Sequence, residues 1–166
     1  FKKNQQIVVN ISELNDWLLS EYQQPLIIGI LNVTPDSFTD GGKFLDHNTA
    51  VNHAMDMIDN GADIIDIGGE STRPFSDPVS EEEELSRVIS VIQKIREKTD
   101  IAISIDTTKS VVAEKACDAG ANIINDISAL SFDHHMIDTV NKYDCPIILM
   151  HMIGNPKTMQ KSPSYS

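Results

Sequence analysis

Short apolar runs alternate with amphipathic stretches along the chain from residue 26 onward. The apolar runs predict strands at residues 26–31, 63–67, 101–105, 122–124 and 146–150. The stretches between them repeat apolar residues three and four positions apart, for example Val51, Ala54, Met55 and Ile58, which predicts helices. Because the expected strands are apolar on both faces, they are typical of parallel strands covered by helices. The pattern therefore predicts an α/β domain.

Residues that begin and end helices support these boundaries. We expect one helix to open at Asn48 and to stop at Gly61, and another to stop at Gly120. Ser80 and Glu83 have the spacing of a capping box ahead of a third helix. Asp133 is expected to cap a last helix, whose inner side would carry Met136, Ile137 and Val140.

A short repeat favours a closed barrel over an open doubly wound sheet. Residues 61–66 and 120–125 have a glycine, an alanine and two isoleucines at corresponding positions. Such a repeat is expected when the same helix-to-strand connection recurs around a closed sheet. No GxGxxG follows the first strand, which weakens the dinucleotide-binding alternative. We therefore expect a (β/α)₈ TIM barrel. A full barrel needs about 250 residues, so the chain should cover roughly its first five βα units.

The first 25 residues are expected to flank the barrel, which would occupy residues 26–166. Within the flanking segment, residues 6–11 resemble a short strand and residues 12–19 a short helix capped by Ser12.

Composition narrows the function. Of the 166 residues, 40% are hydrophobic and 23% are charged, and the net charge is −12. This charge disfavours nucleic acid and anionic membrane surfaces as partners. No apolar run approaches membrane-spanning length, and Cys117 and Cys145 match neither a zinc motif nor a disulfide framework. We expect a cytoplasmic, enzyme-like domain.

Mostly polar residues stand at or just after the end of each expected strand. They are Asn32, the segment 66–73, Asp106, Asn125 with Asp126, and Met150 with His151. In a parallel barrel these ends converge on the face that carries the active site. Asp106 and Asn125 together suit the edge of a nitrogen heterocycle. The alternative is that Asp106 caps the next helix and Asn125 simply ends its strand.

Three residues suggest how a phosphorylated ligand would be held despite the acidic composition. Arg73 is the expected anion contact, because its planar guanidinium pairs with phosphate oxygens. Thr72 could add a hydroxyl or a backbone contact nearby. Asn32 carries an oxygen suited to Mg²⁺, which usually bridges protein and substrate phosphates.

Five stretches resemble the dihydropteroate synthase family, and the resemblance runs from about residue 26 to residue 166. They are residues 32–38, 66–74, 104–107, 125–127, and 150–152 with 156–160. The resemblance implies a transferase of folate biosynthesis. Such an enzyme condenses 6-hydroxymethyl-7,8-dihydropterin diphosphate with p-aminobenzoate to 7,8-dihydropteroate and releases diphosphate. It also implies a sulfonamide target that uses Mg²⁺.

Carried over by position, the resemblance gives each candidate residue a role. Asn32 would bind Mg²⁺ and diphosphate, Met150 would pack on the pterin ring, and Asp106, Asn125 and Arg73 would be the catalytic residues. The remaining matches are pterin-diphosphate contacts and residues of two mobile loops that enclose p-aminobenzoate, namely Thr72, Phe38, Pro74, Asp36 and Asp40. The family's later acidic, lysine and Arg-x-His motifs do not occur in this sequence, so the 166 residues alone should be incomplete.

Three questions stay open at this level. A homodimer is expected, and fusion to another folate-pathway enzyme is possible. A corrinoid methyltransferase domain is the nearest alternative enzyme, but the loop 34–38 argues against it, because methyl transfer needs no diphosphate pocket. A catalytically silent barrel portion that binds a pterin, or only pairs with another subunit, is the alternative from another class.

Overall fold

The strands of this protein form one parallel sheet whose order follows the sequence. The computed structural model describes residues 10–21, 23–34, 47–71 and 78–150. Its strands are β1 (Ile28–Asn32), β2 (Ile64–Gly68), β3 (Ala102–Asp106), β4 (Ile123–Asp126) and β5 (Ile147–Leu149), and each is hydrogen-bonded to the next. A doubly wound sheet would reverse its order at a switch point. This sequential order is that of a (β/α)₈ barrel.

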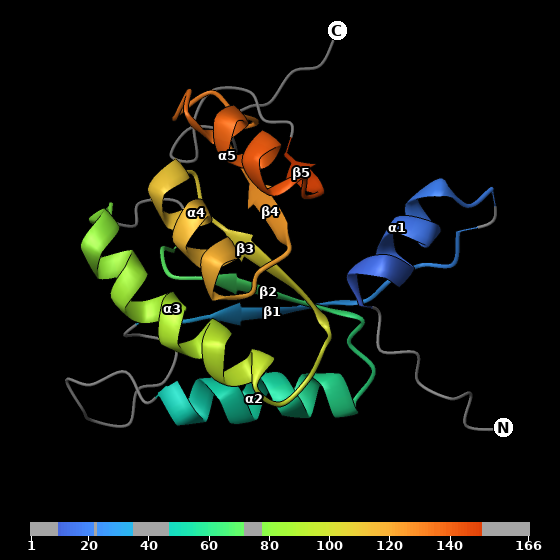
Figure 1. Cartoon of the computed structure of the whole chain (residues 1–166). Coiled ribbons are helices and arrows are strands. Elements are labelled where there is room, and N and C mark those ends of the chain that lie inside the picture. Colours follow the sequence, from blue (N-terminus) through green and yellow to red (C-terminus); the bar gives the residue numbers. More distant parts are fainter. Residues whose placement is uncertain (1–9, 22, 35–46, 72–77, 151–166) are drawn as a thin grey trace, which may run out of the picture.

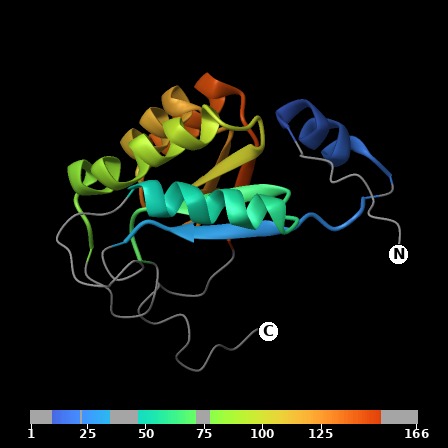
Figure 2. The same ribbon diagram turned by 90° about the horizontal axis from the view of Figure 1, so that it is seen from below.

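Helices connect consecutive strands and cover one face of the sheet. They are α2 (His47–Asp59), α3 (Glu81–Arg96), α4 (Ser110–Ala119) and α5 (Met136–Tyr143). Figure 1 and Figure 2 show them side by side on that face, and each packs against its neighbour along the chain. The buried apolar side chains between helices and sheet form the main core, which includes Leu31, Ile65, Ile103 and Ile124.

The opposite face of the sheet, here called the inner face, would be the interior of a closed barrel. Helix α1 (Ile11–Leu19) lies at the end where the strands begin, away from their arrowheads (Figure 1). Its Leu14 joins a small cluster with Ile64, Ala102 and Ile123. Farther along this face, Ile30 is 64% exposed. Within the described residues, apolar packing on the inner face is therefore concentrated at the end where the strands begin.

The repeated joint is confirmed in detail. Gly61 and Gly120 both have left-handed backbones, with φ of 106° and 116°. After each, the alanine N–H donates to a carbonyl five residues back, at 2.9 Å, and the glycine N–H donates to one three residues back. This is the Schellman pattern that ends helices. The next side chains also correspond. Asp63 accepts the N–H of Ile27, just before β1, and Asn122 accepts the N–H of Ile103 in β3, both at 2.8 Å.

Two of the expected helix starts were wrong. Helix α1 is capped by Asn10, in a reciprocal capping box with Glu13, and not by Ser12. Ser12 instead donates its own N–H to the Asn10 side chain, because the helix begins two residues earlier than expected. Ile11 is its first residue, so the strand expected at residues 6–11 does not reach that far, and residues 1–9 lie outside the described ranges.

Asp133 contacts the starts of two helices, although it is the N-cap residue of neither. Its Oδ2 accepts the N–H of Ser110, the first residue of α4, at 2.7 Å, and its Oδ1 accepts the N–H of His135, the N-cap of α5, at 2.9 Å. Ile137, expected on the inner side of α5, is 44% exposed, while Thr139 is buried. The capping box of α3 forms only in part. Ser80 Oγ accepts from the Glu83 N–H at 3.2 Å, but the Glu83 carboxylate pairs with Arg87.

The glycines at the end of β2 offer a test of this packing. A Cβ on Gly69 would lie 2.8 Å from Val88 Cγ1 and 2.9 Å from Glu84 Cγ of α3. We expect Gly69→Ala to lower the free energy of unfolding by about 1–3 kcal/mol, measured by urea unfolding of the intact protein. Gly68→Ala is the control, since its Cβ would meet nothing closer than 3.5 Å. Equal stability of the two variants would contradict this packing.

Candidate functional site

Four expected or neighbouring positions form one row across the ends of the strands. The register pairs Asn32 with Gly68, Gly68 with Asp106, and Asp106 with Asn125. Residues paired across parallel strands point to the same face. The geometry around Gly68 agrees, because a Cβ there would lie 3.5 Å from Asp106 Oδ2 and 3.7 Å from Asn32 Oδ1. Asn32, Asp106 and Asn125 therefore share one rim of the inner face.

The alternative interpretation of Asp106 as a helix cap is wrong. The N-cap of α4 is Lys109, which makes no side-chain cap, and the Ser110 N–H is satisfied by Asp133. Since other side chains occupy the helix start, the Asp106 carboxylate stays with the strand and faces the rim beside Gly68. This leaves it free to accept a hydrogen bond from a ligand.

Neighbouring carboxylates strongly affect Asp106. Burial raises its pKa from an ordinary 3.8 to about 7, and the charges of Asp66, Glu84, Asp126 and Glu70 add to the increase. The group therefore exchanges its proton near neutral pH, where small changes in its surroundings alter its charge. A bound cation or a positively charged ring would favour its ionised form.

Asp66 lies one layer below the rim, two residues before Gly68. It is buried, and its Oδ2 accepts a hydrogen bond from Asn125 Nδ2 at 3.1 Å. Burial raises the pKa of Asp66, and the nearby Ser104 hydroxyl and Asn125 amide oppose that increase. Its Oδ1 and the Ser104 Oγ are buried without a hydrogen bond of normal geometry in the described part of the chain. The sequence motif contained Asp66, but nothing in its spacing assigned it a separate role.

Asp126, next to Asn125, serves the backbone instead. Its two carboxylate oxygens accept the N–H groups of Ser128 and Leu130, both at 2.8 Å. These bonds hold a turn in which Ala129 and Leu130 adopt left-handed conformations. Strand alternation sends Asn125 to the inner face and Asp126 to the helix-covered face.

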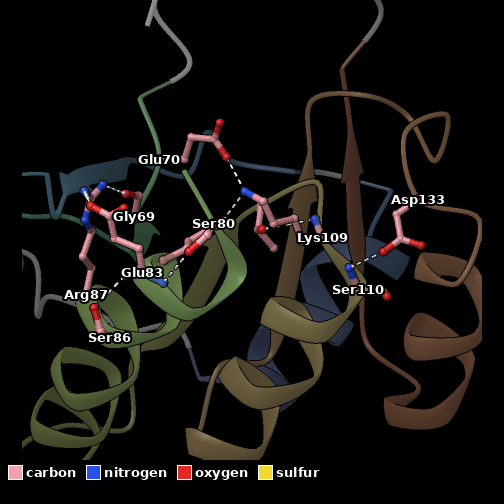
Figure 3. A network of polar contacts seen from close by, with 11 residues as sticks. Gly69, Glu70, Ser80, Glu83, Ser86, Arg87, Lys109, Ser110 and Asp133 are labelled. Carbon is pink, nitrogen blue, oxygen red and sulfur yellow. Dashed lines mark hydrogen bonds and ion pairs between the residues drawn. The ribbon is translucent and has the colours of Figure 1, made fainter. Parts of the chain in front are cut away.

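A partly buried ion cluster behind the rim was not predicted. Lys109, at the start of α4, pairs with Glu70 after β2 and donates to Glu84 Oε2 of α3 at 2.6 Å. Figure 3 shows Lys109 reaching toward Glu70, with Arg87 beside Gly69 and Glu83 on the neighbouring helix. Arg87 donates to the Gly69 carbonyl at 2.6 Å. The polar cluster thus ties two consecutive βα units, β2–α3 and β3–α4, together just behind the strand ends.

Lys109 balances carboxylates that could not stay buried alone. Glu84 is fully buried, and its Oε1 has no hydrogen-bond partner among the described residues. Burial works against the charge on Lys109, but hydrogen bonds to Glu70 and Glu84 outweigh it and raise the lysine pKa. Residues 81–83 are exposed at the start of α3, whereas Glu84 faces inward. With four glutamates in a row, the sequence alone does not indicate which one faces inward.

The remaining expected site residues lie partly outside the described ranges. Those outside are Asp36, Phe38, Asp40, Thr72, Arg73 and Pro74. Met150 is half-buried directly after β5, and its N–H donates to the Asp126 carbonyl at 3.4 Å. It therefore sits one strand beyond Asn125. Within the described ranges, no group of three or more His, Cys, Asp or Glu side chains could hold a metal ion, and no helix is long and apolar enough to span a bilayer.

Comparison with known proteins identifies a family. Residues 28–166 match the model for "Pterin binding enzyme". The chain is 58% identical over 133 residues to a dihydropteroate synthase of Clostridium beijerinckii, which covers 80% of this chain and 49% of that protein. It is 43% identical over 157 residues to an Arabidopsis thaliana folate synthesis bifunctional protein, covering 93% of this chain and 32% of that one.

Solved structures agree with the sequence matches. A Yersinia pestis dihydropteroate synthase in complex with a sulfonamide drug superposes with a TM-score of 0.77 at 48% identity, covering 85% of this chain and 51% of that one. A Xanthomonas albilineans dihydropteroate synthase with 4-aminobenzoic acid gives a TM-score of 0.76 at 44% identity, covering 86% and 50%. The chain spans about half the length of the bacterial relatives it matches.

The raised pKa of Asp106 predicts how stability depends on pH. The folded protein holds this proton more tightly than the unfolded chain does, so the stabilisation is complete below pH 3.8 and is lost as pH rises through about 7. Between pH 5.5 and pH 8, we expect the melting temperature of the wild-type protein to fall by more than that of Asp106→Asn. Identical pH dependence of the two melting curves would contradict the raised pKa.

The ion cluster predicts a large effect from removing its cation. Lys109→Met would leave Glu84 and Glu70 without their cation, and should lower the free energy of unfolding by about 3 kcal/mol. Adding Glu84→Gln should restore part of this loss, because it removes one unpaired charge. Lys115→Ala is the control, since Lys115 only forms an exposed pair with Asp118 at 3.6 Å. Urea unfolding of the intact proteins measures all of these effects, and a loss for Lys109→Met no greater than the control's would argue against the cluster.

Proposed function

The chain belongs to the pterin-binding enzyme family, and on this premise we propose that the protein catalyses the dihydropteroate synthase reaction. It would condense 6-hydroxymethyl-7,8-dihydropterin diphosphate with p-aminobenzoate and release diphosphate. The row of Asn32, Gly68, Asp106 and Asn125 carries this proposal, because it puts hard oxygen donors and a heterocycle-reading pair at one rim. The similarity to dihydropteroate synthases supports it.

Asp106 and Asn125 would bind the pterin ring. A carboxylate only accepts hydrogen bonds, whereas a carboxamide both donates and accepts. Together they complement a ring edge that alternates N–H groups and ring nitrogens. Met150, one strand away, would pack on the face of the ring, and Thr72 would contact the pterin diphosphate from the loop after β2.

The diphosphate and p-aminobenzoate would be held by the loops after β1 and β2. Arg73 would pair with phosphate oxygens, and Phe38 and Pro74 would help enclose p-aminobenzoate. Asp36 and Asp40 would help to order these loops. All five residues are proposed on the resemblance, since they lie outside the described ranges.

The donor set at the rim suits Mg²⁺ only together with a phosphorylated ligand. Asn32 Oδ1 is a neutral, hard oxygen donor beside Gly68, where a Cβ would lie 3.7 Å from Asn32 Oδ1 and 3.5 Å from Asp106 Oδ2. One neutral ligand makes a weak site, and Mg²⁺ usually completes its coordination with substrate phosphates and water. Asn32 would therefore hold the ion, whose contribution when bound is to neutralise charge on the leaving diphosphate.

The proposed reaction needs no strong general base. The C–O bond to diphosphate breaks first, and leaves a positively charged pterin-methyl group. The aniline nitrogen of p-aminobenzoate then forms the new C–N bond and loses a proton. Asp106 would stabilise the cationic ring electrostatically. Closure of the loops around residues 33–42 and 70–78 would exclude water, which otherwise captures the cation.

The wider setting of the protein follows from the same proposal. Its partners would be the two small-molecule substrates, with a second copy of the chain in a homodimer, and not nucleic acid or a membrane. We propose a cytoplasmic location. Sulfonamides should compete with p-aminobenzoate, and the Arabidopsis bifunctional relative supports the possibility of fusion to another enzyme of the pathway.

Replacing the carboxylate at the rim tests the proposed function. Asp106→Asn in the intact protein keeps the size of the side chain but removes its charge, so we expect kcat to fall about 100-fold or more. The measurement is formation of 7,8-dihydropteroate from the two substrates with Mg²⁺. Asp118→Asn is the matched control, since Asp118 lies on the exposed surface of α4.

Two results would count against the proposal. Turnover by Asp106→Asn close to wild type would remove this carboxylate from the mechanism. Pterin binding without any product from the wild-type protein would favour a silent pterin-binding barrel.

A further inference from the structure

Asp66 is the only described side chain that hydrogen-bonds a proposed pterin-binding residue from within the sheet. Its Oδ2 accepts a hydrogen bond from Asn125 Nδ2 at 3.1 Å. The two residues are 59 positions apart in the chain and lie on β2 and β4, on either side of β3. Asp66 is only 7% exposed, so water does not compete freely for this contact. The bond joins the layer below the rim to the rim itself.

This hydrogen bond determines which way the Asn125 carboxamide faces. A carboxylate accepts and does not donate, so the nitrogen end of the carboxamide must turn toward Asp66 and the oxygen end away from it. One N–H is then used by Asp66. The remaining N–H and the carbonyl oxygen are left as a donor beside an acceptor, which complements a ring nitrogen next to an amino group.

We propose that Asp66 is a positioning residue that holds the Asn125 carboxamide in the orientation required to read the amidine edge of a pterin. The inference rests on the proposed function for the identity of the ring. In this role Asp66 affects ligand specificity only through Asn125, and it does not contact the reacting atoms.

The surroundings of Asp66 argue against a purely structural role. Its Oδ1 and the neighbouring Ser104 Oγ are buried without a normal hydrogen bond among the described residues. Burial raises the pKa of Asp66, so its charged form is less favourable in the folded protein than in water. A buried carboxylate with one unsatisfied oxygen weakens a fold more than it supports it.

Asp63, three residues earlier, provides a matched comparison. Its carboxylate also accepts one hydrogen bond, from the Ile27 N–H at 2.8 Å. That bond ties the start of β2 to the backbone just before β1, at the end of the sheet opposite the rim. Asn122 makes the corresponding bond in the second of the two repeated glycine–alanine joints. Asp63 therefore has the structural role that Asp66 lacks.

A double-mutant cycle in the intact protein tests the inference. Binding of 6-hydroxymethyl-7,8-dihydropterin is measured by calorimetry for wild type, Asp66→Ala, Asn125→Ala and the double variant. We expect each single variant to bind about tenfold more weakly, the effect of about one hydrogen bond. The double variant should lose little more than either single variant, because Asp66 acts only through Asn125. Losses that multiply to about a hundredfold would overturn the inference.

Two further variants separate positioning from folding. Asp66→Asn keeps an acceptor oxygen for the Asn125 N–H, and should restore affinity to within about threefold of wild type. Asp66→Ala should not lower the melting temperature, whereas Asp63→Ala should lower it and leave pterin affinity unchanged. Should Asp66→Ala fail to fold, the cycle is repeated with Asp66→Leu, which fills the volume without an acceptor. A lower melting temperature for both Asp66→Ala and Asp66→Leu, with unchanged affinity, would make Asp66 structural.

The binding measurement does not depend on turnover. If the wild-type protein binds the pterin but forms no dihydropteroate, the proposed reaction fails, and the cycle still decides the role of Asp66. If it forms product and the losses multiply, the function stands and the positioning role is wrong. Absence of pterin binding by the wild-type protein would overturn both.

Discussion

The parallel register of the sheet is the constraint on which the rest of this structure depends. Because all five strands run the same way and pair in sequence order, their carboxyl ends meet along one edge. Asn32, Asp106 and Asn125 are separated by 74 and 19 positions in the chain (106 − 32 and 125 − 106), yet the ladder sets them in one row. A register shift of one residue would turn any of them toward the helices. Gly68 keeps the middle of the row open.

The edge that gathers these side chains also gathers negative charge. Asp66, Glu70, Glu84 and Asp126 all raise the pKa of Asp106, and among the described residues Lys109 is the cation that pairs with two of them. Such a site favours positively charged groups and disfavours a free phosphate. The proposed pterin cation would suit it directly, whereas the diphosphate would depend on the Mg²⁺ and the Arg73 contact proposed above. The acidic rim therefore supports the proposal that the rim binds the pterin ring, while Mg²⁺ and the loop residues bind the diphosphate.

Much of the architecture could be predicted from local patterns. The apolar runs located all five strands, and the repeated glycine–alanine joint favoured the sequential order that the structure has. Both glycines end helices in Schellman motifs, because only a left-handed residue closes a helix in that way. Predictions of helix starts were less exact. Asn10 is the cap expected at Ser12, and Asp133, expected only at the start of α5, also accepts an N–H at the start of α4, since a side chain accepts whichever N–H groups the fold brings near it.

The sequence by itself determined the strands, the helices, the family resemblance and the polar residues that follow each strand, because these depend on residue type and spacing along the chain. Only the tertiary structure decided which of those residues act together. It separated Asn125 from Asp126 by strand alternation, buried Glu84 against Lys109 while its three neighbours stayed exposed, and turned the Asn125 carboxamide toward Asp66. These outcomes depend on the faces and distances between elements far apart in the chain, which no local pattern contains.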